Sequence, residues 1–167
     1  MNALQIEYIL ARALRSTGTK FLGVVAADEL PTPTTFPSCF VANTDPHTKR
    51  GSHWVAFYYD TPDDLDFFDS YGMPPEFYDF PSLSLPRTVR VSREEYQSLT
   101  SNVCGHYCIY FLARRSRRQT LSSILQSLRK CGACTDHCVK NFVTDLIDSD
   151  YLTLPTLCSS QSCHSRR

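Results

Sequence analysis

Two apolar segments joined by a short polar turn constrain the fold of this chain more than any other feature. Residues 53–59 and 65–71 are rich in aromatic and aliphatic side chains, and residues 60–64 between them contain a proline and three aspartates. Apolar runs of this length favour strands, and a Pro/Asp-rich segment between two of them favours a tight reversal. The sequence therefore predicts a β-hairpin, around which the other elements must be arranged.

Further strands and helices are predicted on both sides of this hairpin. Residues 3–15 carry apolar side chains at helical spacing, and residues 21–27 and 40–44 have the composition of short buried strands. After another short strand at 88–91, helical spacing returns in three segments between residues 102 and 147. Strands flanked by helices at both ends define an α+β domain. We expect a central mixed or antiparallel sheet whose hairpin packs against a helix.

The hairpin also places a histidine and an aspartate near each other. His53 opens the first strand, and Asp69 lies near the end of the second. Side chains alternate between the two faces of a strand, and residues equidistant from the turn lie opposite one another. With Pro62 near the centre of the turn, His53 falls opposite or diagonal to residues 69–71, and Asp69 has the parity to share its face. The carboxylate can then accept a hydrogen bond from one imidazole nitrogen and leave the other for a nucleophile.

A cysteine at the start of the predicted central helix is the candidate nucleophile. Cys104 follows Ser101 and Asn102, either of which can cap a helix, and the N–H groups and macrodipole of a first helical turn stabilise a thiolate. The backbone N–H of Cys104 and the side-chain amide of Gln97 can stabilise an oxyanion, where losing one donor costs roughly 3–4 kcal/mol. Gly105 leaves room for a substrate backbone. The pattern predicts a cysteine hydrolase.

Each of these residues also has a simpler explanation. A histidine at a strand start usually packs or caps, and an aspartate at a strand end usually forms a turn. A cysteine at the head of an apolar helix is usually a small core residue, and a lone glutamine usually lies at the surface. It is the joint occurrence of all four, in a workable order and at workable spacings, that favours catalysis.

The same residues resemble those of the adenain family, the adenovirus-type maturation proteases, which share a clan with the proteases of ubiquitin-like modifiers. The resemblance covers residues 20–112 and includes the segments Phe21-Leu-Gly23, Val41-Ala-Asn-Thr44, Gly51-Ser-His-Trp-Val-Ala-Phe57 and Phe68-Asp-Ser-Tyr-Gly72. The third segment is similar to the family's Gly-x-His-Trp-x-Ala-Phe motif, which puts His53 at the catalytic histidine. The fourth is similar to Phe-Glu-Pro-Phe-Gly, which puts Asp69 at the acidic position. The seven-residue step from Gln97 to Cys104 is the adenain spacing.

The resemblance implies an activity and a biological setting. It implies a cysteine endopeptidase of a virus or virus-like element that cleaves structural precursor polypeptides at Gly-containing sites during particle maturation. The expected locations are then the virion and the host cell nucleus. A narrow hydrophobic cleft walled by Trp54 and Tyr71 would select small residues beside the scissile bond. Within the same reaction class, the alternative is removal of ubiquitin-like modifiers, whose tails also end in Gly-Gly.

Adenains also use an activating peptide and DNA as cofactors, so the resemblance makes both candidate partners of this chain, although the chemistry itself needs no cofactor. Pro86 occupies the place of the cysteine that tethers the family's peptide, so a disulfide at that place is not expected. DNA would be bound by a basic cluster formed by Arg114, Arg115, Arg117 and Arg118. The alternative for this cluster is a solvated helix end, and phosphate contact would make binding sensitive to salt.

Composition limits the remaining possibilities. Lys+Arg and Asp+Glu are equal at 17 each, so net charge gives no global argument for nucleic acid, and 42% hydrophobic residues is ordinary for a globular protein. The N-terminus lacks the pattern of a signal peptide, and no apolar run approaches the ~18 residues of a membrane helix. We expect an intracellular monomer without membrane contact, with one protease domain over residues 1–155 and a flexible Ser- and Cys-rich tail over 156–167.

The C-terminal third contains a second chemical signal. Four soft metal ligands lie within eight residues: Cys131, Cys134, His137 and Cys138. A structural zinc site normally needs a second pair of ligands at a distance, and no spacing that we recognise supplies it here. We therefore expect no metal in the chemistry. A non-catalytic zinc- or nucleic-acid-binding module in this third is retained as an alternative of a different class.

Overall fold

The predicted hairpin forms the centre of a five-stranded sheet. The computed structural model describes residues 1–148, which fold as an α+β domain, whereas the predicted tail at 156–167 lies outside the described residues. The strands are β1 (Lys20–Val25), β2 (Ser38–Asn43), β3 (Trp54–Thr61), β4 (Asp64–Phe68) and β5 (Thr88–Val91). The helices are α1 (Ala3–Ala13), α2 (Cys104–Arg115), α3 (Leu121–Cys131) and α4 (Thr135–Asp148), with short 3₁₀ turns η1 (Pro75–Phe77) and η2 (Gly132–Cys134). None of the helices within residues 1–148 is long and apolar enough to cross a membrane.

The strands lie in the sheet in the same order as in the sequence, β1-β2-β3-β4-β5. The central pairs β2–β3 and β3–β4 are antiparallel, whereas the outer pairs β1–β2 and β4–β5 are parallel, so the sheet is mixed. The β3–β4 hairpin pairs Thr61 with Asp64 next to the turn, and a register shift separates this pair from Tyr59 opposite Leu65. The turn therefore lies where the Pro/Asp-rich segment predicted it.

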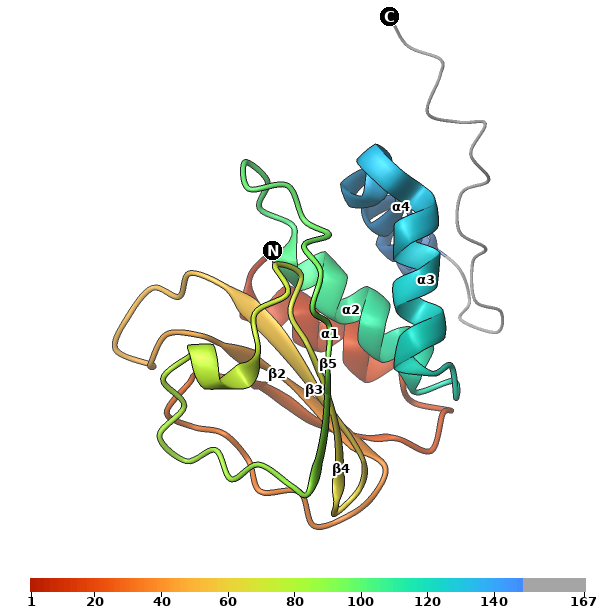
Figure 1. Ribbon diagram of the computed structural model, residues 1–167. Coiled ribbons are helices and arrows are strands. Elements are labelled where there is room, and N and C mark those ends of the chain that lie inside the picture. Colours follow the sequence, from red (N-terminus) through yellow and green to blue (C-terminus); the bar gives the residue numbers. More distant parts are fainter. Residues whose placement is uncertain (149–167) are drawn as a thin grey trace, which may run out of the picture.

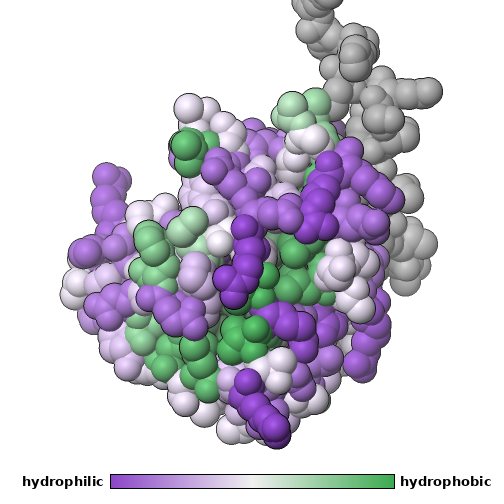
Figure 2. All heavy atoms as spheres, in the orientation of Figure 1, coloured by the Kyte–Doolittle hydropathy of each residue, from purple (hydrophilic) through white to green (hydrophobic). Residues whose placement is uncertain are grey.

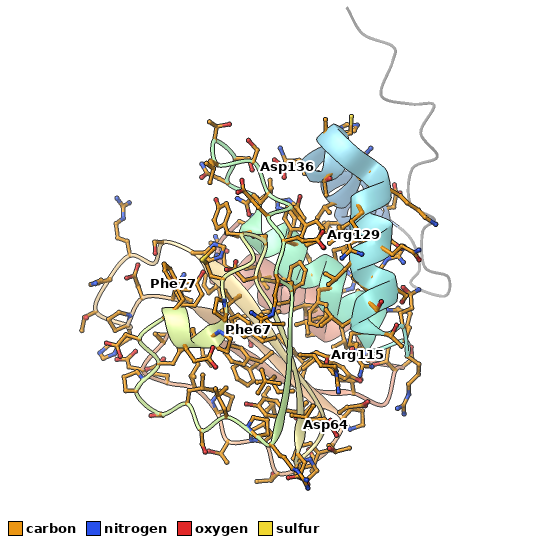
Figure 3. The ribbon with its side chains drawn as sticks, in the orientation of Figure 1. Asp64, Phe67, Phe77, Arg115, Arg129 and Asp136 are labelled. Atoms are coloured by element: carbon orange, nitrogen blue, oxygen red, sulfur yellow. The ribbon has the colours of Figure 1, made fainter. Side chains whose placement is uncertain are left out.

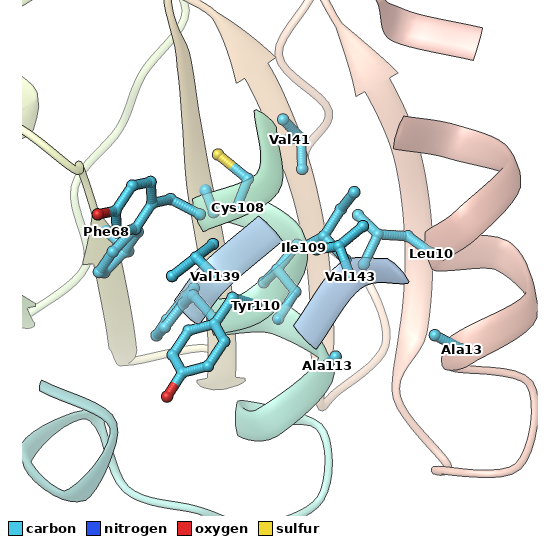
Figure 4. Packing of buried hydrophobic residues seen from close by; sticks show 14 of the residues in the cluster. Leu10, Ala13, Val41, Phe68, Cys108, Ile109, Tyr110, Ala113, Val139 and Val143 are labelled. Atoms are coloured by element: carbon cyan, nitrogen blue, oxygen red, sulfur yellow. The ribbon is translucent and has the colours of Figure 1, made fainter. Parts of the chain in front are cut away.

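All four helices lie on one side of the sheet (Figure 1). Helices α1 and α2 contact the strands, whereas α3 and α4 pack on α2, which therefore lies at the centre of this side. Ten of the twelve residues of α2 are buried, because β3 covers one side of the helix and α1, α3 and α4 cover the others. A helix buried on all sides is expected to be apolar on all sides. Figure 4 shows this core, whose members include Phe68 of the sheet, Tyr110 of α2, and Val139 and Val143 of α4.

The opposite face of the sheet is covered by loops instead of helices. Phe40 and Phe57 stack there with ring centroids 4.5 Å apart, and Phe67 and Phe80 contact Phe57 edge-on. Because side chains alternate along each strand, the central strands contribute to both clusters and are apolar almost throughout. In Figure 2, hydrophobic residues are visible at the surface between hydrophilic residues on the lower part of the face shown.

Most arginines of the basic cluster at the end of α2 form contacts within the protein. Arg115 is buried and donates to Asp66 of β4 at 2.6 Å and to Asp60 of β3 at 3.0 Å, near the end of the sheet where Figure 3 labels Arg115 and Asp64. Arg114 is also buried and lies over the rings of Tyr110 and Phe142.

Arg117 donates to the carbonyl oxygens of Ala13 and Ala113, and Arg118 is exposed. The prediction that Arg114, Arg115, Arg117 and Arg118 form a phosphate-binding surface is therefore wrong for Arg114 and Arg115, because their guanidinium groups are turned into the protein. Local sequence showed the charges but not the carboxylates and rings that lie opposite them.

Asp66 should be the most sensitive charge in this network. It is 1% exposed and accepts hydrogen bonds from Arg90 and Arg115. Removing one partner of a buried ion pair costs about 3–5 kcal/mol, and Asp60 remains as a partner for Arg115, so we expect Asp66→Asn to cost about 3 kcal/mol of unfolding free energy. Urea denaturation measures this value. The partly exposed Asp64, which pairs with Arg90, is the control, and Asp64→Asn should cost less than about 1 kcal/mol.

Candidate active site

The ends of the hairpin bring a histidine and an aspartate together. His53 immediately precedes β3 and Asp69 immediately follows β4, and the register of Ala56 opposite Phe68, continued outward, places His53 opposite Tyr71. Asp69 has the same parity as Tyr71 and therefore shares its face. The His53 Nε2 atom lies 2.6 Å from Asp69 Oδ1, with His53 8% exposed and Asp69 fully buried. These two residues meet as the hairpin geometry predicts.

Four donors surround the Asp69 carboxylate. Oδ1 accepts from the backbone N–H of Tyr71 at 3.0 Å in addition to His53, and Oδ2 accepts from the N–H of Met73 at 3.0 Å and from the hydroxyl of Tyr78 at 2.7 Å. Burial by itself raises the pKa of Asp69, but the hydrogen bond and positive charge of His53, with the other donors, lower it below the ordinary value. The carboxylate is thus held ionised and in one orientation.

The backbone of Asp69 is fixed separately by Ser92. The Ser92 hydroxyl accepts from the Asp69 N–H at 3.0 Å and donates to the Asp69 carbonyl at 2.8 Å, and Ser92 is fully buried. Ser92 immediately follows β5, so the edge strand contributes to placing the carboxylate.

Cys104 is the first residue of α2, where the helix begins without a side-chain cap. Val103 occupies the N-cap position, and no side chain accepts a hydrogen bond from the first turn. The prediction that Ser101 or Asn102 caps this helix is therefore wrong. Burial by itself raises the pKa of Cys104, but His53 and the backbone N–H groups of Trp54 and Gly105 lower it below the ordinary thiol value.

His53 lies between these two acidic groups. Burial by itself lowers the pKa of His53, but hydrogen bonds to Asp69 and Cys104, together with their negative charges, outweigh burial and raise it to about 9. Nε2 is bound to Asp69, so Nδ1 is the nitrogen available to Cys104. At neutral pH the opposite shifts of Cys104 and His53 favour a thiolate–imidazolium pair.

Gln97 lies in the loop between β5 and α2 and is 1% exposed, so it is not the surface residue that its sequence position alone suggested. Its Nε2 group donates to the carbonyl of Ser101 at 2.8 Å and to the hydroxyl of Tyr71 at 3.0 Å. Its Oε1 atom accepts from the hydroxyl of Ser70 at 2.8 Å. The structure therefore places Gln97 beside the candidate site with its polar atoms already hydrogen-bonded.

A cavity of about 400 Å³ opens over these residues. Its wall includes His53, Gln97 and Cys104, as well as Trp54 and Tyr71, which the resemblance to adenains implies as walls of the substrate cleft. One side of the cavity was not predicted, since residues 1–3 and Arg50 also line it. The cavity is accordingly more polar than the hydrophobic cleft that we expected.

Gly105 has a different role from the predicted one. It is buried and does not line the cavity, and a Cβ atom at this position would lie 2.9 Å from Ile6 Cδ1 and 3.4 Å from Met1 Cβ. The missing side chain thus allows α1 to pack closely on α2, and leaves no space for a substrate. The prediction that Gly105 admits a substrate backbone is therefore wrong.

The four soft ligands Cys131, Cys134, His137 and Cys138 lie at the junction of α3, η2 and α4. Within residues 1–148, no three His, Cys, Asp or Glu side chains lie close enough together to hold a metal ion. Cys138 is buried in the helical layer, and Cys131 donates to the carbonyl of Ser127. The described part of the chain thus gives the zinc hypothesis no ligand set.

Sequence reasoning missed several residues that shape the site. Tyr78 lies in an aromatic and proline-rich segment without periodicity, so nothing in the sequence linked it to Asp69. Asn2 did carry a signal, because an Asn followed three residues later by a Gln is a capping pattern, and the two side chains do form a capping box at the start of α1. That box fixes the helix end beside the cavity.

Comparison with known proteins adds little to this description. No protein-family model and no curated protein matches the sequence. Among solved structures, the chain is similar to the central domain of the uncharacterized Lpg1148 protein from Legionella pneumophila. That similarity has a TM-score of 0.49 and 14% sequence identity, and it covers 89% of this chain and 98% of that chain. At these values the similarity supports no argument about fold or activity.

The paired pKa shifts predict how Cys104 reacts with an alkylating agent. Because its pKa is lowered, the reactive thiolate persists as pH falls below the ordinary thiol pKa of about 8.5, and alkylation by iodoacetamide should stay fast at neutral pH. Replacing His53 with Gln removes the cation and should move the midpoint of the rate–pH profile upward toward that ordinary value. Mass spectrometry of the Cys104 peptide measures both profiles.

Cys134 is the internal control for this experiment, because it is a partly exposed cysteine on η2. Its alkylation profile should be the same in the wild type and in His53→Gln. If the Cys104 profile is also unchanged by His53→Gln, the two side chains are not electrostatically coupled.

Proposed function

We propose that this chain is a cysteine endopeptidase whose reacting groups are His53, Asp69 and Cys104, with oxyanion stabilisation from the region of Gln97. One observation carries the proposal. His53 is paired with the buried Asp69 and electrostatically coupled to a thiol of lowered pKa at the start of a central helix, and both His53 and Cys104 line one cavity. A core cysteine or a turn-forming aspartate would need neither the charge pair nor the cavity.

The geometry supports a sequence of steps for peptide-bond hydrolysis. The Cys104 thiolate attacks the carbonyl carbon, and the developing oxyanion is stabilised by the Cys104 N–H and by donors on the Gln97 side of the cavity. The His53 imidazolium then donates its proton to the leaving amine, while Asp69 holds the ring in place. Water then attacks the acyl-enzyme and gives a proton to His53 as the general base, and collapse of the tetrahedral intermediate expels the Cys104 thiolate, which restores the thiolate–imidazolium pair.

The proposed substrates follow from the resemblance to adenains. These are structural precursor polypeptides of a virus or virus-like element, cut at Gly-containing sites during particle maturation, with the virion and host cell nucleus as the places of action. Trp54 and Tyr71 on the cavity wall support selection of small residues beside the scissile bond, because two large rings leave little width for a side chain. Removal of ubiquitin-like modifiers is the alternative within this reaction class.

Substitution of the nucleophile tests the reaction class. Cys104→Ala should reduce peptide hydrolysis to background and abolish labelling by a thiol-directed acylating probe, and Asp69→Asn should lower kcat/KM by about 10³–10⁴-fold. Cys134→Ala is the matched cysteine control and should retain wild-type turnover. Peptidase activity that survives in Cys104→Ala would falsify the assignment, as would a wild-type protein whose Cys104 never takes up the probe.

A second assay separates the two substrate classes. Peptides with a hydrophobic residue upstream of an internal Gly-x-Gly or Gly-Gly sequence represent precursor cleavage, and a ubiquitin-like modifier fused through its terminal Gly-Gly represents deconjugation. We expect cleavage of the short peptides. Processing of the modifier fusion alone would instead assign the deconjugating activity.

A further inference from the structure

Both amide hydrogens of Gln97 are engaged in the resting protein. One is donated to the carbonyl of Ser101 at 2.8 Å and the other to the hydroxyl of Tyr71 at 3.0 Å, and the residue is 1% exposed. A primary amide has two N–H donors and no third. To bind an oxyanion directly, Gln97 must break one of these buried bonds and leave a buried acceptor unsatisfied, which is unfavourable.

Neighbouring groups hold this amide in one orientation. The carbonyl of Ser101 can only accept, so the nitrogen of Gln97 must face it and the oxygen must face the hydroxyl of Ser70. The backbone is also fixed, because the N–H groups of Tyr96 and Gln97 both donate to the carbonyl of Ser70 at 2.9 and 3.1 Å. The Gln97 side chain is therefore a rigid donor aimed at Tyr71.

The Tyr71 hydroxyl is placed to use that donor. It accepts from Gln97, and its own proton has no acceptor within residues 1–148. Tyr71 lines the cavity together with Cys104, and its ring centroid lies 4.9 Å from that of His53. Burial and the negative charges of Cys104 and Asp69 raise the pKa of Tyr71, so the hydroxyl stays protonated and able to donate at neutral pH.

We propose that the Tyr71 hydroxyl is the side-chain donor to the oxyanion, and that Gln97 is a positioning residue that holds and polarises it. This inference rests on the proposed peptidase function and refines it. As the Sγ–C bond forms, the carbonyl π electrons move to oxygen, and Tyr71 donates a hydrogen bond to that oxygen without transferring its proton. The Cys104 N–H supplies the other donor. The hydrogen bond from Gln97 makes the Tyr71 O–H a stronger donor.

Tyr71→Phe tests the proposal because it removes one oxygen atom and keeps the ring. We expect kcat for a Gly-Gly peptide to fall by about 100-fold with little change in KM, as is typical when one oxyanion donor is lost. Affinity for a peptide aldehyde, which forms a tetrahedral adduct with Cys104, should fall in parallel. Alkylation of Cys104 by iodoacetamide forms no oxyanion, so its rate and pH profile should be unchanged, which also shows that the fold is intact.

The companion variants decide between Tyr71 and Gln97. Gln97→Ala should lower kcat by no more than Tyr71→Phe, and the double variant should be no worse than Tyr71→Phe alone, because both act through one hydroxyl. Tyr8→Phe removes an exposed hydroxyl on α1 and should leave kcat unchanged.

Two results would overturn the inference in different ways. Wild-type kcat in Tyr71→Phe together with a large loss in Gln97→Ala would make Gln97 the direct donor while leaving the peptidase function in place. A wild-type protein without Cys104-dependent turnover would remove the peptidase function and this inference together.

Discussion

The buried carboxylate of Asp69 is the interaction on which the arrangement of the site depends. It is fully buried, and its donors come from the residue preceding β3, the turn after β4 and the segment after η1. An unpaired buried charge costs several kcal/mol, so the carboxylate stabilises only the arrangement in which all of these segments are in place. One side chain thus couples the ends of the hairpin to a loop without regular structure. The position of His53 follows from that coupling.

The second constraint is the burial of α2, which explains why the candidate nucleophile lies at a helix end. Because β3 and the other helices enclose most of this helix, its first turn is the part that meets the cavity. The absence of a side-chain cap then has a consequence, because a capping oxygen would accept from N–H groups of the first turn, and the N–H of Gly105 in that turn instead lowers the pKa of Cys104. An anion at this position takes the place of the cap.

Sequence reasoning succeeded where a local, periodic rule decides the outcome. Strand alternation placed His53 and Asp69 on one face, and the Pro/Asp-rich segment located the turn to within the residues that form it. The mixed sheet and the helix starting at Cys104 followed from the same kind of pattern. The catalytic roles assigned to these residues remain predictions, because geometry alone does not test them.

Sequence reasoning failed where a residue's role depends on a partner from a distant element. Gly105 looked like space for a substrate, but Ile6 of α1 occupies that space. Arg115 looked solvated, but two aspartates of the sheet lie opposite it. Tyr78 had no sequence signal, since its contact with Asp69 depends on the path of an irregular loop. Periodicity predicts which face a side chain occupies, but it does not predict what another element places against that face.

In the proposed peptidase reaction, two sets of donors would act at different stages, and their separation would affect the rate. The N–H groups of Trp54 and Gly105 lower the pKa of Cys104 and so stabilise the thiolate before reaction, whereas Tyr71, whose hydroxyl accepts from Gln97, lines the cavity. Stabilising the thiolate alone lowers its nucleophilicity as well as its pKa, so it adds little to the rate. As the bond to carbon forms, negative charge leaves the sulfur and develops on the carbonyl oxygen. A donor that binds the carbonyl oxygen only once that oxygen becomes negative stabilises the transition state more than the ground state. Such a difference in stabilisation is what would accelerate the reaction.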